Sequence, residues 1–305
     1  MAQVLLIGAS RGLGYEMARQ YVANGDQVIA TARDDAGLAR LTELGVSRAL
    51  RVDVADPASV SGLSWQLDGV ALDLAVHVAG VPARGDALSP PTQQDFDQVM
   101  HANVLGAMQV IPQVAPLVEE GCGGQGGIFA FVSSIRGSIA AADSSGSWLY
   151  RVSKSALNMA VASARFDYPR ATMVLLHPGW AQTDMGGAEA PVTAEDSVRG
   201  MRQLLARLPQ QQAMRHGHAL AGKGIHHGVG NGRIVLDQQQ GQGVSRVHGR
   251  SVPQPAAGSG SVRRLLAAQL LDQRDDHQHD GTGDDADGQV GQHAGDGAAH
   301  TAPVQ

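Results

Sequence analysis

The alternation of short apolar stretches with longer amphipathic ones constrains this chain most, because it excludes an all-helical or all-β fold. Up to about residue 208, helix-like segments separate six strand-like segments. Strands are expected at residues 3–7, 27–32, 49–54, 71–78, 127–133 and 172–176, and helices at 14–24, 38–44, 92–119, 150–166 and 193–208. Strands that alternate with helices form a parallel sheet covered on both faces. We therefore expect an α/β fold with a doubly wound, mostly parallel sheet in three layers.

The composition changes abruptly near Leu208. No Phe, Tyr or Trp follows Trp180, and glutamine runs, glycines and all but three of the histidines lie beyond Leu208. Such a segment buries too little apolar surface to offset its conformational entropy. We predict a folded domain at residues 1–208 and a low-complexity, largely disordered tail at residues 209–305.

Two features of the tail leave alternatives open. Residues 232–237 are strand-like but follow an unusually long connection. They could complete the sheet; we favour a domain without its last strand and a tail that is read from a shifted frame or is otherwise unselected. Residues 276–287 partly match a calcium loop, but the closing Glu is missing, so we expect no metal site there or at the histidine pairs 226–227 and 277–279.

Charge and cysteine content exclude several classes of protein. The net charge of −6 argues against a protein that binds nucleic acid by neutralising phosphates. The single cysteine, Cys122, excludes an internal disulfide and a metal bound by two thiolates. No segment is long and apolar enough to span a bilayer, and no export signal is visible. We expect a cytoplasmic protein without nucleic-acid or membrane partners.

Glycines after the first strand predict a phosphate site. That strand runs into Gly8-Ala9-Ser10-Arg11-Gly12-Leu13-Gly14. Glycines allow the tight turn and the close backbone approach that a pyrophosphate needs, and the following helix N-terminus stabilises its charge. An ordinary strand–turn–helix is the alternative, but the position of the run favours a Rossmann dinucleotide site.

The end of the second strand favours NADPH over NADH. Enzymes that use the unphosphorylated dinucleotide usually place an acid there to bind the ribose 2′-hydroxyl. Ala32 replaces that acid, and Arg33 offers donors suited to a 2′-phosphate, with Arg11 as a second candidate. Both could instead be ordinary surface arginines.

Two further places would contact the same dinucleotide. Asp53, followed by Val54, comes after the third strand and could accept a hydrogen bond from an adenine amino group, or simply form a turn. Ala79 and Gly80 end the fourth strand, where small residues let the backbone pass close to a ribose.

A tyrosine and a lysine supply the candidate chemistry. Tyr150 and Lys154 lie four residues apart, on one face of a predicted helix. An unperturbed tyrosine has a pKa near ~10, too high for efficient proton transfer at neutrality. A nearby ammonium and an oxidised nicotinamide would lower it. Ser133 and Ser134 end the preceding strand, where a hydroxyl could reach the same carbonyl oxygen.

In order along the chain, these residues resemble the pattern of short-chain dehydrogenases/reductases. The pattern comprises Gly8-x3-Gly12-x-Gly14, Asp53, Ala79-Gly80, Asn103, Ser134, Tyr150-x3-Lys154 and Pro178-Gly179, and it covers residues 1–208. More narrowly, residues 134–139, 145–151 and 177–185 are similar to the C-factor/sniffer-like carbonyl reductase branch.

The resemblance implies an NADPH-dependent oxidoreductase that interconverts a carbonyl and an alcohol by hydride transfer. Tyr150 would be the general acid/base, and Lys154 would bind the nicotinamide ribose and lower the pKa of Tyr150. Ser134 would hold the substrate oxygen, and Asn103 would anchor a water in a proton relay. The carboxamide end of the cofactor would lie against Pro178, Gly179 and Thr183.

The chain also departs from the family pattern. Val78 stands where an asparagine usually precedes Ala79, and His77 comes before it. His77 could be an extra acid/base, but we favour a packing role at a strand end. Two other functions stay open: a dinucleotide-binding signalling or sensor protein without efficient turnover, and an inactive product with an altered C-terminus. The expected partners are a small carbonyl or alcohol substrate of unknown identity and a second copy in a homodimer.

Overall fold

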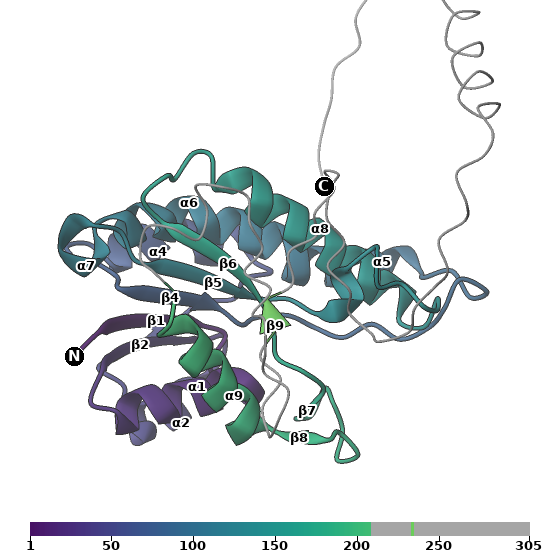
Figure 1. The fold of residues 1–305 in the computed structure, drawn as a ribbon, viewed down its shortest axis with the longest axis horizontal. Coiled ribbons are helices and arrows are strands. Elements are labelled where there is room, and N and C mark those ends of the chain that lie inside the picture. Colours follow the sequence, from purple (N-terminus) through teal and green to yellow (C-terminus); the bar gives the residue numbers. More distant parts are fainter. Residues whose placement is uncertain (209–232, 235–305) are drawn as a thin grey trace, which may run out of the picture. The chain divides into compact units, whose positions relative to one another are not determined.

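The computed structural model describes residues 1–208 and the short strand at residues 233–234 (Figure 1). All of these residues belong to the first of two units of the chain, residues 1–242. The expectations for the rest of the tail, including the calcium-like run and the histidine pairs, fall outside the described residues. Within the described part, no helix is long and apolar enough to cross a membrane.

A parallel sheet forms the middle layer, as predicted (Figure 1). Its strands are β1 (Gln3–Ile7), β2 (Gln27–Ala32), β3 (Arg48–Arg51), β4 (Leu74–His77), β5 (Ile128–Val132) and β6 (Thr172–His177), in the order β3-β2-β1-β4-β5-β6. Side chains alternate along each strand, so Leu5 and Ile7 enter one core cluster while Val4 and Leu6 enter the other. The predicted three-layer α/β class is confirmed.

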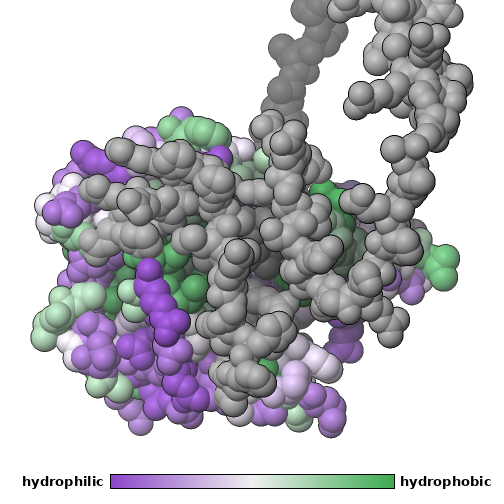
Figure 2. Space-filling model, viewed as in Figure 1, coloured by the Kyte–Doolittle hydropathy of each residue, from purple (hydrophilic) through white to green (hydrophobic). Residues whose placement is uncertain are grey.

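Helices cover both faces of this sheet. On one face lie α1 (Gly12–Ala23), α2 (Asp35–Leu44) and α9 (Ala194–Leu205), whose outward surface is mostly hydrophilic (Figure 2). On the other lie α3 (Pro57–Ser61), α4 (Leu63–Gln66), α6 (Gly106–Glu119) and α8 (Trp148–Ala164). Short elements complete the described part: α5 (Gln93–Met100), α7 (Gly121–Gly124), η2 (Ile135–Gly137), β7 (Ala181–Gln182) and β8 (Val192–Thr193).

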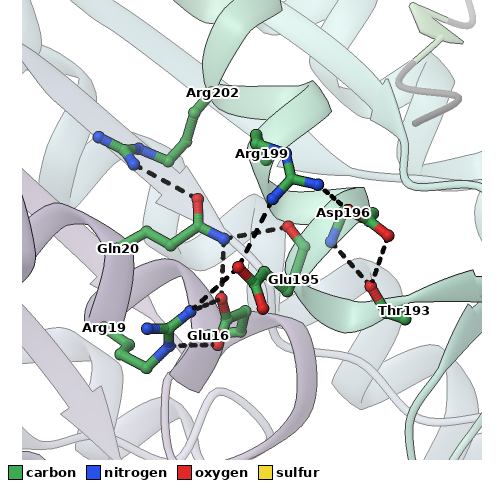
Figure 3. Close-up of polar contacts among 8 residues, drawn as sticks. All are labelled: Glu16, Arg19, Gln20, Thr193, Glu195, Asp196, Arg199 and Arg202. Atoms are coloured by element: carbon green, nitrogen blue, oxygen red, sulfur yellow. Dashed lines mark hydrogen bonds and ion pairs between the residues drawn. The ribbon is translucent and has the colours of Figure 1, made fainter. Parts of the chain in front are cut away.

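Helix α9 is tied to α1 by polar contacts between their facing sides (Figure 3). The Gln20 amide nitrogen donates to the backbone oxygen of Glu195 over 3.0 Å, and Arg202 donates to the Gln20 amide oxygen over 3.3 Å. From the same helix, Ser197 Oγ donates to the Pro178 carbonyl over 2.6 Å. These contacts fix the loop that follows β6.

The predicted long helix at residues 92–119 is interrupted. Between α5 and α6 lies a π-helical segment, η1 (His101–Leu105), which contains Asn103. The Asn103 side chain accepts from the Val81 backbone N–H over 2.7 Å and donates to the Val81 carbonyl over 3.0 Å. Apolar periodicity did not reveal this interruption, since π-turns occur within otherwise regular α-helices.

The described residues include one more strand at the edge of the sheet beyond β6. Strand β9 (Arg233–Ile234) pairs there with Leu176 and His177, in the antiparallel direction. This pairing agrees with the alternative that residues 232–237 complete the sheet, and the domain boundary stays a prediction. Backbone pairing over two residues uses only the free N–H and C=O groups at a sheet edge, and the strand-like pattern of residues 232–237 is compatible with it.

Candidate active site

The candidate site lies at the carboxyl ends of β1, β4, β5 and β6. The order of the strands reverses between β1 and β4, which is where open α/β sheets bind ligands. Gly8 has a φ of +86°, and a Cβ there would lie 2.8 Å from backbone atoms of Ala79. A Cβ on Gly14 would lie 2.2 Å from the Gly8 oxygen. The loop can therefore turn this tightly only with glycine at both positions.

The loop after β6 approaches the same glycines. A Cβ on Gly12 would lie 3.6 Å from Thr183 Cγ2, so these two distant parts of the chain are adjacent. Gly179 has a φ of +79°. Leu13, Pro178, Gly179 and Thr183 all line one cavity of about 440 Å³. Residues expected at the pyrophosphate and at the carboxamide end of a dinucleotide thus lie side by side.

Arg11 and Arg33 line a neighbouring cavity of about 560 Å³. Both are exposed: Arg11 Nη1 lies 3.6 Å from an Asp184 carboxylate oxygen and Arg33 Nε lies 3.9 Å from that of Asp34. Arg84, which the sequence analysis did not single out, lines this cavity too. Only its positive charge in a loop after β4 could have suggested it.

The residues proposed to contact the adenine, and Ser10 of the glycine loop, make contacts with other residues of the protein. Asp53 accepts a hydrogen bond from the Ala55 N–H over 3.0 Å, the geometry of the turn alternative. Val54 is buried, and its carbonyl lies 2.5 Å from where a Cβ on Gly106 would be. The Ser10 carbonyl accepts from Arg40 Nε over 3.1 Å. None of these contacts tests binding of a nucleotide.

Ser134 and Tyr150 line the same cavity, and the Ser134 hydroxyl is near enough to the Tyr150 phenol to lower its pKa. Ser133 also borders it, but its hydroxyl donates to Asn158 Oδ1 over 2.6 Å, within the protein. Of the two serines, therefore, only Ser134 presents its hydroxyl to the tyrosine.

Lys154 lies beneath this pair and is buried. Its Nζ donates to the Val132 carbonyl over 2.9 Å and lies 5.7 Å from the centre of the Tyr150 ring. Loss of hydration on burial lowers the pKa of Lys154 to about 8. A Cβ on Gly80 would lie 3.5 Å from this Nζ and 3.1 Å from Asn103 Oδ1, so lysine, asparagine and the end of β4 converge.

The electrostatics of Tyr150 differ from the expectation. Burial raises the pKa of its phenol, while the hydrogen bond from Ser134 and the positive charge of Arg136 lower it. The expected lowering by Lys154 is not found in this structure. The lysine ammonium donates to the Val132 carbonyl and lies 5.7 Å from the centre of the tyrosine ring.

His77 has the surroundings of a packing residue. It is buried in β4, its ring stacks on Phe131 with centroids 5.9 Å apart, and burial lowers its pKa to about 3. It lines neither cavity. Because His77 stays neutral and borders neither cavity, its role is to pack within the fold, as the sequence analysis favoured.

The arrangement defines a class of protein. A glycine-bounded crevice at the sheet's switch point, beside a tyrosine and a buried lysine, suits an enzyme that moves a hydride with a dinucleotide and a proton with a side chain. The family model described as short chain dehydrogenase matches residues 2–192. The chain belongs to this family and is an NAD(P)-dependent oxidoreductase.

Known relatives agree with the narrower branch expected from the sequence. The chain is 32% identical over 230 residues to 1-hydroxy-2-glutathionyl-2-methyl-3-butene dehydrogenase of Rhodococcus sp. (strain AD45), covering 72% of this chain and 97% of that protein. It is 39% identical over 146 residues to the C-signal protein of Myxococcus xanthus, covering 47% of this chain and 86% of that protein.

Solved structures show the same fold. One is a short-chain dehydrogenase/reductase from Burkholderia multivorans with bound NADP, with a TM-score of 0.62, 32% identity and coverage of 69% of this chain and 93% of that one. Another is the carbonyl reductase Sniffer of D. melanogaster, with a TM-score of 0.62, 28% identity and coverage of 68% and 92%. C-signal and Sniffer are the two types of relative that the sequence motifs indicated.

Proposed function

We propose that this protein is an NADPH-dependent oxidoreductase that interconverts a carbonyl compound and its alcohol. One observation carries the proposal: Ser134 and Tyr150 share a cavity with Leu13 of the glycine loop and with Thr183. A substrate oxygen between the two hydroxyls would therefore lie next to the crevice expected to hold the cofactor. Similar proteins are carbonyl reductases, or have been solved with bound NADP.

The crevice fits a dinucleotide with a 2′-phosphate. The space left by the missing side chains of Gly8 and Gly14 lets a pyrophosphate approach the start of α1. Arg11 and Arg33 border one cavity and would bind the 2′-phosphate, which favours NADPH over NADH. Lys154 would hydrogen-bond the nicotinamide ribose. Bound NADPH supplies the hydride.

Tyr150 would donate its phenolic proton to the carbonyl oxygen as the alcohol forms. Ser134 Oγ accepts from the Arg136 backbone N–H over 3.2 Å, so its own proton stays available to donate toward the substrate oxygen. A pKa of about 8 keeps most of Lys154 protonated at neutral pH. Lys154 and Asn103, which meet beside Gly80, would return a proton to Tyr150.

Replacing Tyr150 by Phe tests this assignment directly. The change removes the proton donor and leaves the ring, so kcat/KM for an aldehyde or ketone should fall by about 10²–10⁴-fold, the usual contribution of a general acid. Steady-state oxidation of NADPH measures the rate, and quenching of protein fluorescence measures NADPH binding, which should change by less than about twofold.

Ser133→Ala is the matched control, because this neighbouring hydroxyl is bonded to Asn158. It should retain kcat within about threefold at a temperature where it is folded. Unchanged turnover in Tyr150→Phe would remove the tyrosine from the mechanism.

Similarity to the C-signal protein favours one second candidate, a dinucleotide-binding signalling protein without efficient turnover. That function predicts tight NADPH binding and no NADPH oxidation across a broad panel of aldehydes, ketones and quinones. If any compound of this panel is turned over, and Tyr150→Phe abolishes that turnover, the protein is an enzyme.

A further inference from the structure

The cavity that holds Ser134 and Tyr150 also contains a cation that the proposed proton transfer does not require. Among the described residues that line this cavity, Arg136 carries the one permanent charge, and none is Asp or Glu. Much of the wall is apolar, including Ile135, Trp180 and Met185. In a mostly apolar cavity, the few polar and charged side chains determine how a bound ligand is oriented.

Arg136 is held in position by the loop before α8. Its Nη1 donates to the Gly146 carbonyl over 3.1 Å. Arg151 Nε donates to the same carbonyl over 2.9 Å, and Arg151 Nη2 pairs with Asp143 over 2.8 Å. A guanidinium has five N–H donors in one plane, so the bond to Gly146 leaves four of them for a ligand.

The neighbouring carboxylates are paired with other arginines. Asp143 is bound to Arg151, and Asp184 lies 3.6 Å from Arg11. In the part of the chain that the structure describes, no carboxylate lies within ion-pair distance of Arg136. The charge is therefore available to an anionic group that enters the cavity.

Arg136 is also close to the reacting position. It follows Ser134 by two residues, and its backbone N–H donates to Ser134 Oγ over 3.2 Å. Its charge reaches the Tyr150 phenol, whose pKa it lowers. A substrate carbonyl held by Ser134 and Tyr150 would thus extend toward the guanidinium.

We propose that Arg136 selects carbonyl substrates that carry a carboxylate: oxo acids in reduction and hydroxy acids in oxidation. A planar guanidinium can bind a carboxylate through two parallel hydrogen bonds, which fixes orientation as well as affinity. In reduction, the carbonyl carbon gains the hydride from NADPH, its oxygen gains the Tyr150 proton, NADP⁺ forms, and the carboxylate is unchanged. This inference rests on the proposed function.

A matched pair of aldehydes tests it. The kcat/KM for 4-carboxybenzaldehyde should exceed that for its methyl ester by about tenfold or more in the unmodified protein. Arg136→Met, which keeps the apolar stem, should bring the ratio near one; Arg136→Lys should keep part of it; Arg136→Glu should invert it. A ratio taken within one variant cancels any change in folding or in the pKa of Tyr150.

Arg170→Ala is the control variant, because this exposed arginine pairs with Glu120 and lines neither cavity. It should keep the ratio of the unmodified protein. Equal kcat/KM for the two aldehydes, or a preference that survives Arg136→Met, would overturn the role of Arg136 while leaving the proposed function intact.

Binding separates this inference from turnover. In the Tyr150→Phe protein with NADPH bound, calorimetry should show 4-carboxybenzaldehyde binding about tenfold more tightly than the ester, and the added change Arg136→Met should abolish that difference. Equal affinities would contradict the inference even if no aldehyde were turned over, whereas failure of every carbonyl to oxidise NADPH would count against the proposed function alone.

Discussion

At the scale of the residue, burying the Lys154 ammonium in the candidate site lowers the stability of the folded protein. The ammonium is buried and has a single backbone carbonyl as hydrogen-bond acceptor, and the pKa falls from 10.5 to about 8. A difference of that size corresponds to a penalty of about 3 kcal/mol for the charged form in the folded state. This penalty refers to the lysine with its hydrogen bond to the Val132 carbonyl already in place.

Lys154→Met should therefore stabilise the protein at pH 7, by up to about 3 kcal/mol, while removing activity. Below pH 8 the lysine is charged in both folded and unfolded states, and the penalty is complete. Between pH 8 and 10.5 the unfolded state binds more protons than the folded state, so the unmodified protein gains stability as pH rises. Urea unfolding at pH 7 and pH 10 measures both values.

The advantage of Lys154→Met should shrink at pH 10. A variant that is less stable than the unmodified protein at pH 7 would show that burial does not disfavour the ammonium.

Gly8 tests the steric origin of the glycine loop. Gly8→Ala should cost about 1–3 kcal/mol and abolish NADPH binding, since the new Cβ would meet backbone atoms of Ala79 at 2.8 Å. Gly25→Ala is the control: its φ of +81° is as unusual, but nothing lies within 4 Å of a Cβ there. Thermal unfolding of both variants separates the effect of the contact with Ala79 from that of backbone strain. Equal losses of stability in the two variants would show that the contact contributes nothing.

At the scale of the element, caps and contacts decide where helices α5 and α9 begin. Thr92 and Thr193 occupy the same position in the two helices, and each Oγ accepts from the N–H of an aspartate three residues on, Asp95 or Asp196. The helix expected from residue 193 is confirmed, with Thr193 as its N-cap. The two sites differ in what the helix supports, because α9 also holds the loop after β6 through Ser197.

Thr193→Ala and Thr92→Ala should each reduce the free energy of unfolding by about 1 kcal/mol, the usual value of a lost cap. Urea unfolding measures this effect. Only Thr193→Ala should also raise KM for NADPH, by about two- to fivefold, because it loosens the helix that positions Pro178. Equal effects of the two variants on KM would mean that α9 does not hold the loop after β6 in position.

At the scale of the whole molecule, Leu208 is the last core residue in the part of the chain that the structure describes. Met201, Leu205 and Leu208 are buried in the cluster beneath α1 and α9. All proposed cofactor and catalytic residues lie between Gly8 and Thr183. The boundary predicted at Leu208 therefore leaves both cores and the candidate site intact.

A chain that ends at Leu208 should fold cooperatively and bind NADPH within about threefold of the full chain. A chain that ends at Gly200 loses the three buried side chains, at about 1.5–3 kcal/mol each, a large share of a typical domain's stability. It should therefore show no cooperative transition. Circular dichroism and NADPH titration compare the two chains; failure of the longer one to fold would place essential structure beyond Leu208.

The sequence alone determined the sheet, its covering helices and the place of the glycine loop. Each depends on local rules: periodicity marks strands and helices, and the φ values at Gly8 and Gly12 suit glycine. The spacing of Tyr150 and Lys154 also sufficed to place them on one helix.

Tertiary structure alone decided which serine faces the tyrosine, where a π segment turns Asn103 inward, and what sets the pKa of Tyr150. Asn158 holds Ser133 and Val81 holds Asn103. Burial raises the pKa of the Tyr150 phenol, and Ser134 and Arg136 offset part of that rise. These outcomes depend on contacts between residues far apart in the chain. Hydrogen-bond geometry and burial exist only once those residues are packed together, so no spacing in the sequence encodes them.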